Sequence, residues 1–181
     1  FLLDYHQDRL ERTFYAVFQR HCPWQLATIL LQAPSQGLFK VRFLYNATDF
    51  SIEVQPYVPK IIKTLKLVDV GKYTYSHKWT NRSAINAAFD QRGNCDDVII
   101  VRDGQITDSS YANLIFFNGS EWITPKKPLL EGTCRARLLD NGKIKTANLG
   151  INELKTFKGL KLINAMRDMD QEIIPMDRIV Y

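Results

Sequence analysis

The beginning of the chain has the spacing of apolar residues that is typical of helices. Over residues 4–21, apolar side chains recur at steps of three and four while charged and amide side chains occupy the other positions. This pattern predicts an amphipathic helix. A second apolar cluster at 26–30 predicts a short helix that ends at Ala33, because Pro34 disfavours helical backbone in the residue before it.

The spacing then changes to that of strands. Apolar and polar side chains alternate over residues 39–45 and again over 50–54, on either side of an Asn-Ala-Thr-Asp segment. Such alternation around a turn predicts a pair of strands. Residues 61–70 predict one more strand, and we therefore expect residues 1–72 to form a small lobe of α+β character.

Beyond residue 72, short apolar runs are separated by Asp-Gly and Asn-Gly pairs. These pairs favour tight turns between antiparallel strands, so residues 73–181 predict a larger, barrel-like lobe. The predicted helices lie at 80–91, 132–139 and 152–157, and the predicted strands at 97–101, 105–107, 113–117, 121–124, 160–164 and 172–180. This order of elements predicts a two-lobe protein of the α+β or α/β class.

The composition narrows the class of protein. The chain has 181 residues, of which 45% are hydrophobic, and 24 Lys plus Arg against 19 Asp plus Glu give a formal charge of +5. The apolar fraction excludes a disordered chain, and without a run of about 18 apolar residues we expect no membrane span. The basic residues are spread along the chain, so we expect no nucleic-acid partner.

The cysteines and the first residues bear on the cell compartment. Three cysteines at wide spacing, without a CxxC pair or a histidine cluster, predict neither a disulfide framework nor a metal site. The opening Phe-Leu-Leu-Asp-Tyr has no basic region ahead of an apolar stretch, so it predicts no secretory signal. We expect a cytoplasmic protein.

Two segments of the second lobe carry candidate chemistry. Lys78 follows Tyr73 and Tyr75, and a lysine in an aromatic setting can attack carbonyl groups when its amine pKa is lowered. The simpler interpretation is an ordinary exposed lysine. Asp108 to Asn113 form a polar link between two apolar strands, which is either a binding loop or a plain turn.

Two further segments are candidates for holding an anion. Gly132-Thr133-Cys134 stands at a predicted helix start, where free backbone amides and a hydroxyl can hold a phosphate, although many helix starts bind nothing. His6 and Arg9 are three residues apart on the first predicted helix. They can point together at an anion, or they can simply face water.

Taken together and in this order, the four segments resemble the class IV aminotransferase family, the fold type IV enzymes that use pyridoxal 5′-phosphate. Branched-chain and D-amino acid aminotransferases and 4-amino-4-deoxychorismate lyase belong to this family. The resemblance implies a D-amino acid aminotransferase-like fold with a small N-terminal lobe and a larger C-terminal lobe that carries the cofactor site. It also implies a homodimer that acts on a small amino acid or an amino-chorismate.

The resemblance implies a role for each motif. Lys78 matches the lysine that forms a Schiff base with the cofactor, and Arg9 matches the arginine that pairs with its phosphate. Asp108 stands where the family has a glutamate, five residues before an Asn, and would pair with the pyridine nitrogen through a shorter side chain. The other residues that the resemblance places at the cofactor are Gly132, Thr133, Cys134, Asn164 and Ala165.

Substrate recognition depends on less specific signals. The chain is shorter than typical members of the family that it resembles. Arg42, on the predicted strand 39–45, is the candidate for binding an anionic group of the substrate, and Tyr75 is the candidate for a polar group near Lys78.

Three functions stay open. The first is transfer of the amino group of an amino acid through Lys78. The second is cleavage of the 4-amino-4-deoxychorismate lyase type, which releases pyruvate and an aromatic amine, and Asn164-Ala165 and the short chain favour it. The third is a catalytically degenerate, cofactor-binding protein, which Asp108 in place of glutamate suggests.

Overall fold

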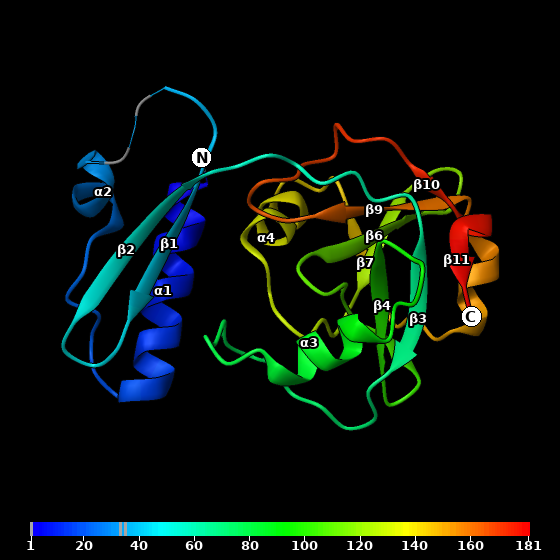
Figure 1. Ribbon diagram of the computed structural model, residues 1–181, viewed down its shortest axis with the longest axis horizontal. Helices are drawn as coiled ribbons and strands as arrows, with labels where there is room; N and C mark the ends of the chain where they lie inside the picture. Colours follow the sequence, from blue (N-terminus) through cyan, green and yellow to red (C-terminus); the bar gives the residue numbers. More distant parts are fainter. Residues whose placement is uncertain (1, 33, 35) are drawn as a thin grey trace. The chain divides into compact units, whose positions relative to one another are not determined.

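The computed structural model describes residues 2–32, 34 and 36–181, except for the side chain of Gln32. The chain divides into two compact units, Phe1–Lys60 and Ile61–Tyr181 (Figure 1). The expected boundary, after residue 72, differs from this division. Residues 61–72 belong to the second unit because strand β3 (Leu65–Asp69) pairs in parallel with β4 of that unit.

The first unit contains two helices and a hairpin. Helix α1 (Leu3–Phe18) is followed by α2 (Leu26–Ile29), a 3₁₀ turn at Leu30–Gln32, and strands β1 (Phe39–Tyr45) and β2 (Phe50–Pro56). The strands pair in antiparallel register from Phe39 opposite Pro56 to Tyr45 opposite Phe50. The predicted hairpin is confirmed, whereas the predicted end of the second helix at Ala33 lies outside the described residues.

Aromatic side chains form the core of this unit. The ring of Trp24 contacts Phe14, Phe43, Tyr45 and Phe50 edge-on, at centroid distances of 5.2 to 5.9 Å. Such edge-to-face contacts add to the free energy of burial. The ring of Trp24 therefore links α1 to both strands of the hairpin.

The second unit contains two sheets of mixed direction. One has the strand order β10-β9-β6-β7-β8 and the other β11-β3-β4-β5. The strands are β4 (Asp97–Arg102), β5 (Gln105–Ile106), β6 (Asn113–Phe117), β7 (Trp122–Pro125), β8 (Lys145–Ala147), β9 (Gly159–Ile163), β10 (Ile174–Pro175) and β11 (Ile179–Val180). The pairs β3–β4, β3–β11 and β7–β8 are parallel. The expectation of an antiparallel lobe is therefore only partly correct.

The single strand predicted over residues 172–180 is wrong. The segment forms β10, a 3₁₀ turn at Met176–Arg178 and β11, and the two strands belong to different sheets. Pro175 has no backbone N–H and cannot continue a sheet ladder as a donor. The chain therefore leaves one sheet at Pro175 and joins the other four residues later.

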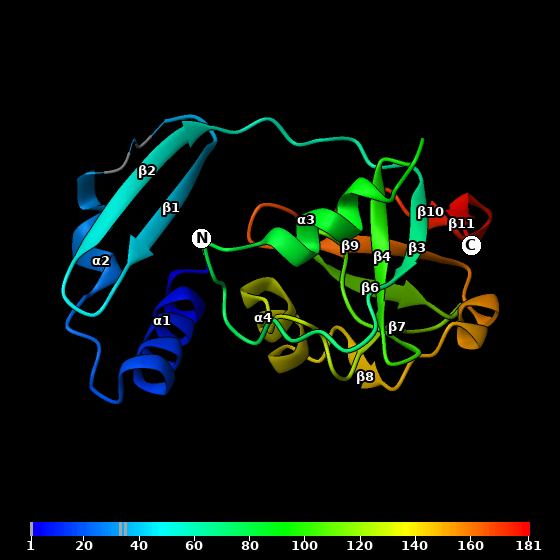
Figure 2. The same cartoon turned by 60° about the horizontal axis from the view of Figure 1, so that its bottom comes forward.

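Short helices accompany these sheets. Helix α3 (Ser83–Asp90) packs Ile85 and Ala88 onto Val98 and Ile100 of β4, and it lies beside β4 in both ribbon views (Figures 1 and 2). Helix α4 (Thr133–Asp140) follows the loop after β7, and a 3₁₀ helix covers Asn152–Thr156. In the part of the chain that the structure describes, no helix is long and apolar enough to cross a bilayer.

Candidate functional site

The loop between β5 and β6 holds a buried carboxylate. Asp108 is only 5% exposed. Its Oδ1 accepts a hydrogen bond from Nδ2 of Asn113 at 2.7 Å, and its Oδ2 accepts one from the backbone N–H of Leu130 at 2.9 Å. The backbone carbonyl of Asp108 accepts a hydrogen bond from Ile100 of β4. The carboxylate is therefore held on both sides by fixed donors.

Burial governs the ionisation of this carboxylate. Loss of water raises the pKa of Asp108 to about 6, although the hydrogen bonds from Leu130 and Asn113 lower it. At neutral pH the group is therefore mostly ionised, but it is costly to keep charged in an apolar surrounding. Such a carboxylate stabilises a cation or a protonated nitrogen brought next to it.

Gly132 brings the start of α4 against the same loop. A Cβ atom on Gly132 would lie 2.1 Å from Oδ1 of Asn113, which is far inside contact distance. Nδ2 of Asn113 also donates a hydrogen bond to the carbonyl of Leu130 at 2.8 Å. Glycine is therefore needed here so that Asn113 can support both Asp108 and the segment that leads into α4.

The first turn of α4 presents groups that can hold an anion. Gly132 is the N-cap residue of α4, and the first amides of any helix have no partner within the helix. Thr133 is only 3% exposed, and among the described residues its buried Oγ1 has no hydrogen-bond partner. A hydroxyl and free amides at a positive helix end are a suitable site for a phosphate.

Arg135 fixes this helix from the opposite side. Its Nη2 donates a hydrogen bond to the carbonyl of Pro125 at 2.9 Å, and its Nε donates one to Oγ1 of Thr124 at 3.3 Å. Both acceptors belong to β7. The guanidinium of Arg135 therefore anchors the helix start to the sheet and is not available at the candidate anion site.

The turn after β9 meets both segments. The Sγ atom of Cys134 lies 3.7 Å from the carbonyl oxygen of Arg167, and Asn164 and Arg167 form an isolated bridge. Asn164 also donates a long hydrogen bond from Nδ2 to the carbonyl of Tyr111, at 3.4 Å. The structure thus brings together the loop of Asp108, the start of α4 and the turn that contains Asn164 and Ala165.

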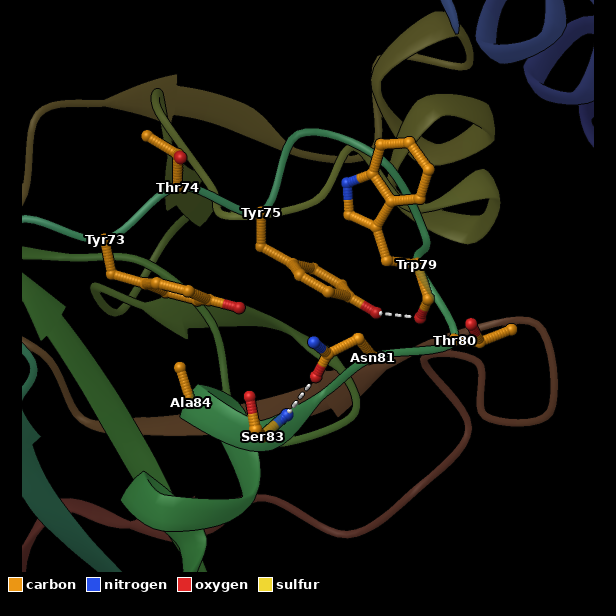
Figure 3. A pocket seen from close by; sticks show the side chains of 8 residues that line it. All are labelled: Tyr73, Thr74, Tyr75, Trp79, Thr80, Asn81, Ser83 and Ala84. Atoms are coloured by element: carbon orange, nitrogen blue, oxygen red, sulfur yellow. Dashed lines mark hydrogen bonds between the residues drawn. The ribbon is translucent and has the colours of Figure 1, made fainter.

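Lys78 lies in the segment between β3 and α3 and is exposed. The hydroxyl of Tyr75, which is 5% exposed, donates a hydrogen bond to the carbonyl of Trp79 at 2.7 Å. This bond closes a short loop around Lys78, as Figure 3 shows for its two ends. Burial raises the pKa of the Tyr75 phenol, so the hydroxyl stays protonated and continues to donate.

A cavity of about 350 Å³ adjoins this loop. The rings of Tyr73 and Tyr75 stack at a centroid distance of 6.3 Å along it (Figure 3). The lining residues are Tyr73, Thr74, Tyr75, Trp79, Thr80, Asn81, Ser83 and Ala84. Tyr75, the predicted polar group near Lys78, is thus a pocket wall whose hydroxyl is already engaged.

Arg9 and Arg42 belong to the first unit. Arg9 is half-buried, its Nη2 lies 3.4 Å from Nδ1 of His6, and burial lowers its pKa. Arg42 pairs across the hairpin with Glu53, with Nη1 and Oε2 2.6 Å apart. The guanidinium of Arg42 therefore already has a structural partner.

Sequence reasoning named Asn113 only as the end of the polar link and as the Asn five residues after Asp108. It missed two other contributors, Leu130 and Arg82. Leu130 contributes through its backbone N–H and carbonyl, and no side-chain pattern reveals such a role. Arg82 contributes through a hydrogen bond to the backbone carbonyl of Ser110, which is 28 residues away in the sequence.

Comparison with known proteins identifies one family. The family model described as amino-transferase class IV matches residues 1–171. An uncharacterized protein from Haemophilus influenzae is 37% identical over 171 residues, which cover 92% of this chain and 91% of that protein.

Two solved structures are similar over nearly the whole chain. A "putative 4-amino-4-deoxychorismate lyase" from Haemophilus somnus has a TM-score of 0.88 and 35% identity, and the match covers 93% of this chain and 90% of that one. A "Putative amino-acid aminotransferase" from Mesorhizobium loti has a TM-score of 0.81 and 25% identity, with 97% and 90% covered. The short length of this chain is thus close to that of these similar proteins.

Proposed function

Because the chain belongs to the class IV aminotransferase family, we propose that it is a pyridoxal-phosphate enzyme that holds its cofactor on Lys78. The observation that carries this proposal is the buried pair of Asp108 and Asn113 beside the first turn of α4. A buried carboxylate and a helix start with free amides, within one unit, suit the two ends of this cofactor.

The residues of the second unit fit pyridoxal phosphate chemically. Pyridoxal phosphate supplies an aldehyde that binds amines and a ring that withdraws electrons from the carbon next to a bound amine. In our proposal Asp108 keeps a proton on the ring nitrogen, because an ionised carboxylate favours a cation beside it. The buried hydroxyl of Thr133, which has no partner among the described residues, donates to the phosphate.

The other proposed contacts complete the phosphate end. The backbone amides of Thr133 and Cys134 point from the helix start, Gly132 permits their close approach, and Asn164 and Ala165 line the neighbouring turn. Arg9 is proposed as the charged partner of the phosphate, since a guanidinium donates two parallel hydrogen bonds to an oxyanion.

Lys78 has two tasks in this proposal. Its amine holds the aldehyde end of the cofactor until a substrate amine replaces it, and it then carries a proton to and from the substrate α-carbon. The bond between Tyr75 and Trp79 supports both tasks, because it restricts the backbone on either side of the lysine.

We place lyase-type cleavage first among the reactions, which reverses the order suggested by the sequence. The similarity to the Haemophilus somnus structure supports this choice, since it combines 35% identity with coverage of 90% of that chain. Amino transfer is the second candidate, supported by the similarity to the Mesorhizobium loti structure. A catalytically degenerate protein stays as the third.

One set of assays separates the three. The protein, supplied with pyridoxal phosphate, is given 4-amino-4-deoxychorismate, and pyruvate and the aromatic amine are measured; in parallel, amino acids and a keto acid are supplied and amino transfer is measured. We expect pyruvate release that is lost in Lys78→Ala and kept in Lys72→Ala, a nearby exposed lysine. Amino transfer alone would favour the second candidate, and cofactor binding with neither product would favour the third.

We also propose that the protein is a cytoplasmic homodimer, as the resemblance implies. Light scattering after size-exclusion chromatography measures the assembly directly. A mass of about 21.0 kDa, that of one chain, would contradict the dimer.

A further inference from the structure

Arg82 lies at the edge of the pocket but does not line it. Its neighbours Asn81 and Ser83 both contribute to the pocket wall, whereas Arg82 is not among the lining residues. Its Nη2 donates a hydrogen bond of 2.5 Å to the backbone carbonyl of Ser110. The side chain of Arg82 therefore reaches the loop that also contains Asp108.

This contact joins two segments that are far apart in sequence. Arg82 follows Lys78 by four positions, and Ser110 follows Asp108 by two. Ser110 is 8% exposed, so the guanidinium meets the carbonyl where water competes little. Hydrogen bonds from a charged donor are stronger than neutral ones, and more so in such a surrounding.

The stability of α3 does not explain an arginine at this position. Arg82 is the N-cap residue of α3 and makes no side-chain capping bond. Small polar residues are preferred there, and a positive charge is unfavourable at the positive end of a helix dipole. Asn81 supplies the local support instead, because its Oδ1 accepts the N–H of Ser83 at 3.0 Å.

The same guanidinium acts on the aromatic wall of the pocket. Burial raises the pKa of the Tyr73 and Tyr75 phenols, and the positive charge of Arg82 opposes this rise at both. The charge of Arg82 thus acts on Tyr73 and Tyr75, which precede Lys78. Its hydrogen bond to Ser110 restrains the backbone that follows Lys78.

We propose that Arg82 is a positioning residue, which holds the segment carrying Lys78 against the loop carrying Asp108. The use of this tie in catalysis rests on the proposed function, whereas the tie itself does not. Together with the bond from Tyr75 to Trp79, it fixes the backbone on both sides of Lys78. Arginine suits this task because its charge is permanent and its donors are arranged in a rigid plane.

Three variants test the proposal. Arg82→Gln removes the charge and shortens the reach, and Arg82→Lys keeps a charged donor. The matched control is Arg92→Gln, because Arg92 lies just beyond the other end of α3. Its Nη1 donates a hydrogen bond to the Phe89 carbonyl at 3.1 Å and its guanidinium lies over the Phe89 ring, so both of these contacts are local.

The first measurement uses the protein without cofactor. In Arg82→Gln, we expect backbone hydrogen exchange to become about tenfold faster in both residues 76–82 and residues 108–112, since the two segments lose the same tie. Tenfold corresponds to about 1.4 kcal/mol. Unchanged exchange in either segment, or an equal change in Arg92→Gln, would overturn the proposal.

The second measurement uses the protein with pyridoxal phosphate. We expect Arg82→Gln to weaken cofactor binding about tenfold and to shift the pH midpoint of the bound cofactor's absorption band, and Arg82→Lys to recover most of both. A lower melting temperature with an unchanged midpoint would show a merely structural role and overturn the proposal. If the wild-type protein binds no cofactor, the proposed function fails, and the exchange measurement alone decides whether Arg82 ties the segments.

Discussion

The two units bury different kinds of side chain. In the described part of Phe1–Lys60, the buried side chains are apolar, namely Leu10, Phe14, Trp24 and Leu26. Every buried polar or charged side chain among the described residues lies in Ile61–Tyr181: Asp97, Thr107, Asp108, Ser109, Ser110, Asn113, Thr124, Thr133, Arg135 and Arg167.

This difference indicates where chemistry is concentrated. Burying a polar group costs free energy unless a partner or a function compensates for it. In the second unit, several of these buried polar side chains gather around the loop of Asp108 and the start of α4. Such a cluster is typical of a functional site. The first unit gains its stability from aromatic packing, and its Arg9 is half-buried.

The largest expected effect is on the aromatic core of the first unit. Trp24→Ala should destabilise this unit by about 3–5 kcal/mol, the usual cost of removing a large buried aromatic side chain. Segment-resolved hydrogen exchange measures it, with Trp79→Ala, at 48% exposure, as the control. If Trp24→Ala left exchange over residues 3–18 and 39–56 unchanged, the aromatic account of this unit would be wrong.

The pH dependence of the second unit should follow Asp108. Its pKa in the folded protein is about 6 against an ordinary value of 3.8, so folding favours the protonated form. The resulting stabilisation is fully present below about pH 4 and is lost as the pH rises through 6. Because one pKa unit corresponds to about 1.36 kcal/mol, the whole shift amounts to about 3 kcal/mol in unfolding free energy.

The comparison of wild type with Asp108→Asn isolates this effect. Urea unfolding of the cofactor-free proteins between pH 4 and pH 7 gives the two free energies. We expect their difference to change by about 2 kcal/mol over this range, because the carboxyl of the unfolded chain is already partly ionised at pH 4. Burial also raises the pKa of Asp97, but that contribution is common to both proteins and cancels. A difference that does not vary with pH would contradict the account of Asp108.

Gly132→Ala should have a smaller effect, localised to the site. The new methyl group would displace Asn113, and overpacking of this kind costs about 1–3 kcal/mol. Thermal unfolding measures the loss. In an Asn113→Ala background the same substitution should cost clearly less, and equal costs in both backgrounds would exclude the proposed contact.

The smallest expected effect concerns Arg42. Its ion pair with Glu53 is partly exposed, with side chains 44% and 39% accessible, so Arg42→Gln should cost less than about 1 kcal/mol in unfolding free energy. Glu53→Gln breaks the same pair and is the matched control. If Arg42 binds the substrate, only Arg42→Gln raises KM; equal kinetics in both variants would remove Arg42 from the substrate site.

Local spacing predicted most of the fold. The hairpin of the first unit and strand 113–117 have the predicted bounds or nearly so. The alternation in the hairpin, and the apolar run that ends at an Asn-Gly turn in strand 113–117, depend only on near neighbours. Strand β8 was missed, since Lys145–Ala147 is short, largely exposed and paired in parallel with β7. The parallel pairs and the boundary after Lys60 depend on long-range contacts, which no local pattern contains.

In the candidate site, too, only relations between residues close in sequence could be predicted. Asp108 and Asn113 are five residues apart, so their relation could be expected from the sequence, and their hydrogen bond is seen. The close approach of Gly132 to Asn113 and the reach of Arg82 to Ser110 connect distant segments. They exist because the sheet brings those segments together, and only the folded chain reveals them.

The central claim is that Lys78 holds the cofactor, and one measurement tests it most directly. The protein is mixed with pyridoxal phosphate, reduced with borohydride, digested and mapped by mass spectrometry. We predict that the reduced cofactor is found on the peptide containing Lys78, that Lys78→Ala abolishes this adduct, and that Lys72→Ala leaves it intact. Equal labelling of several exposed lysines, or labelling that survives Lys78→Ala unchanged, would contradict the account.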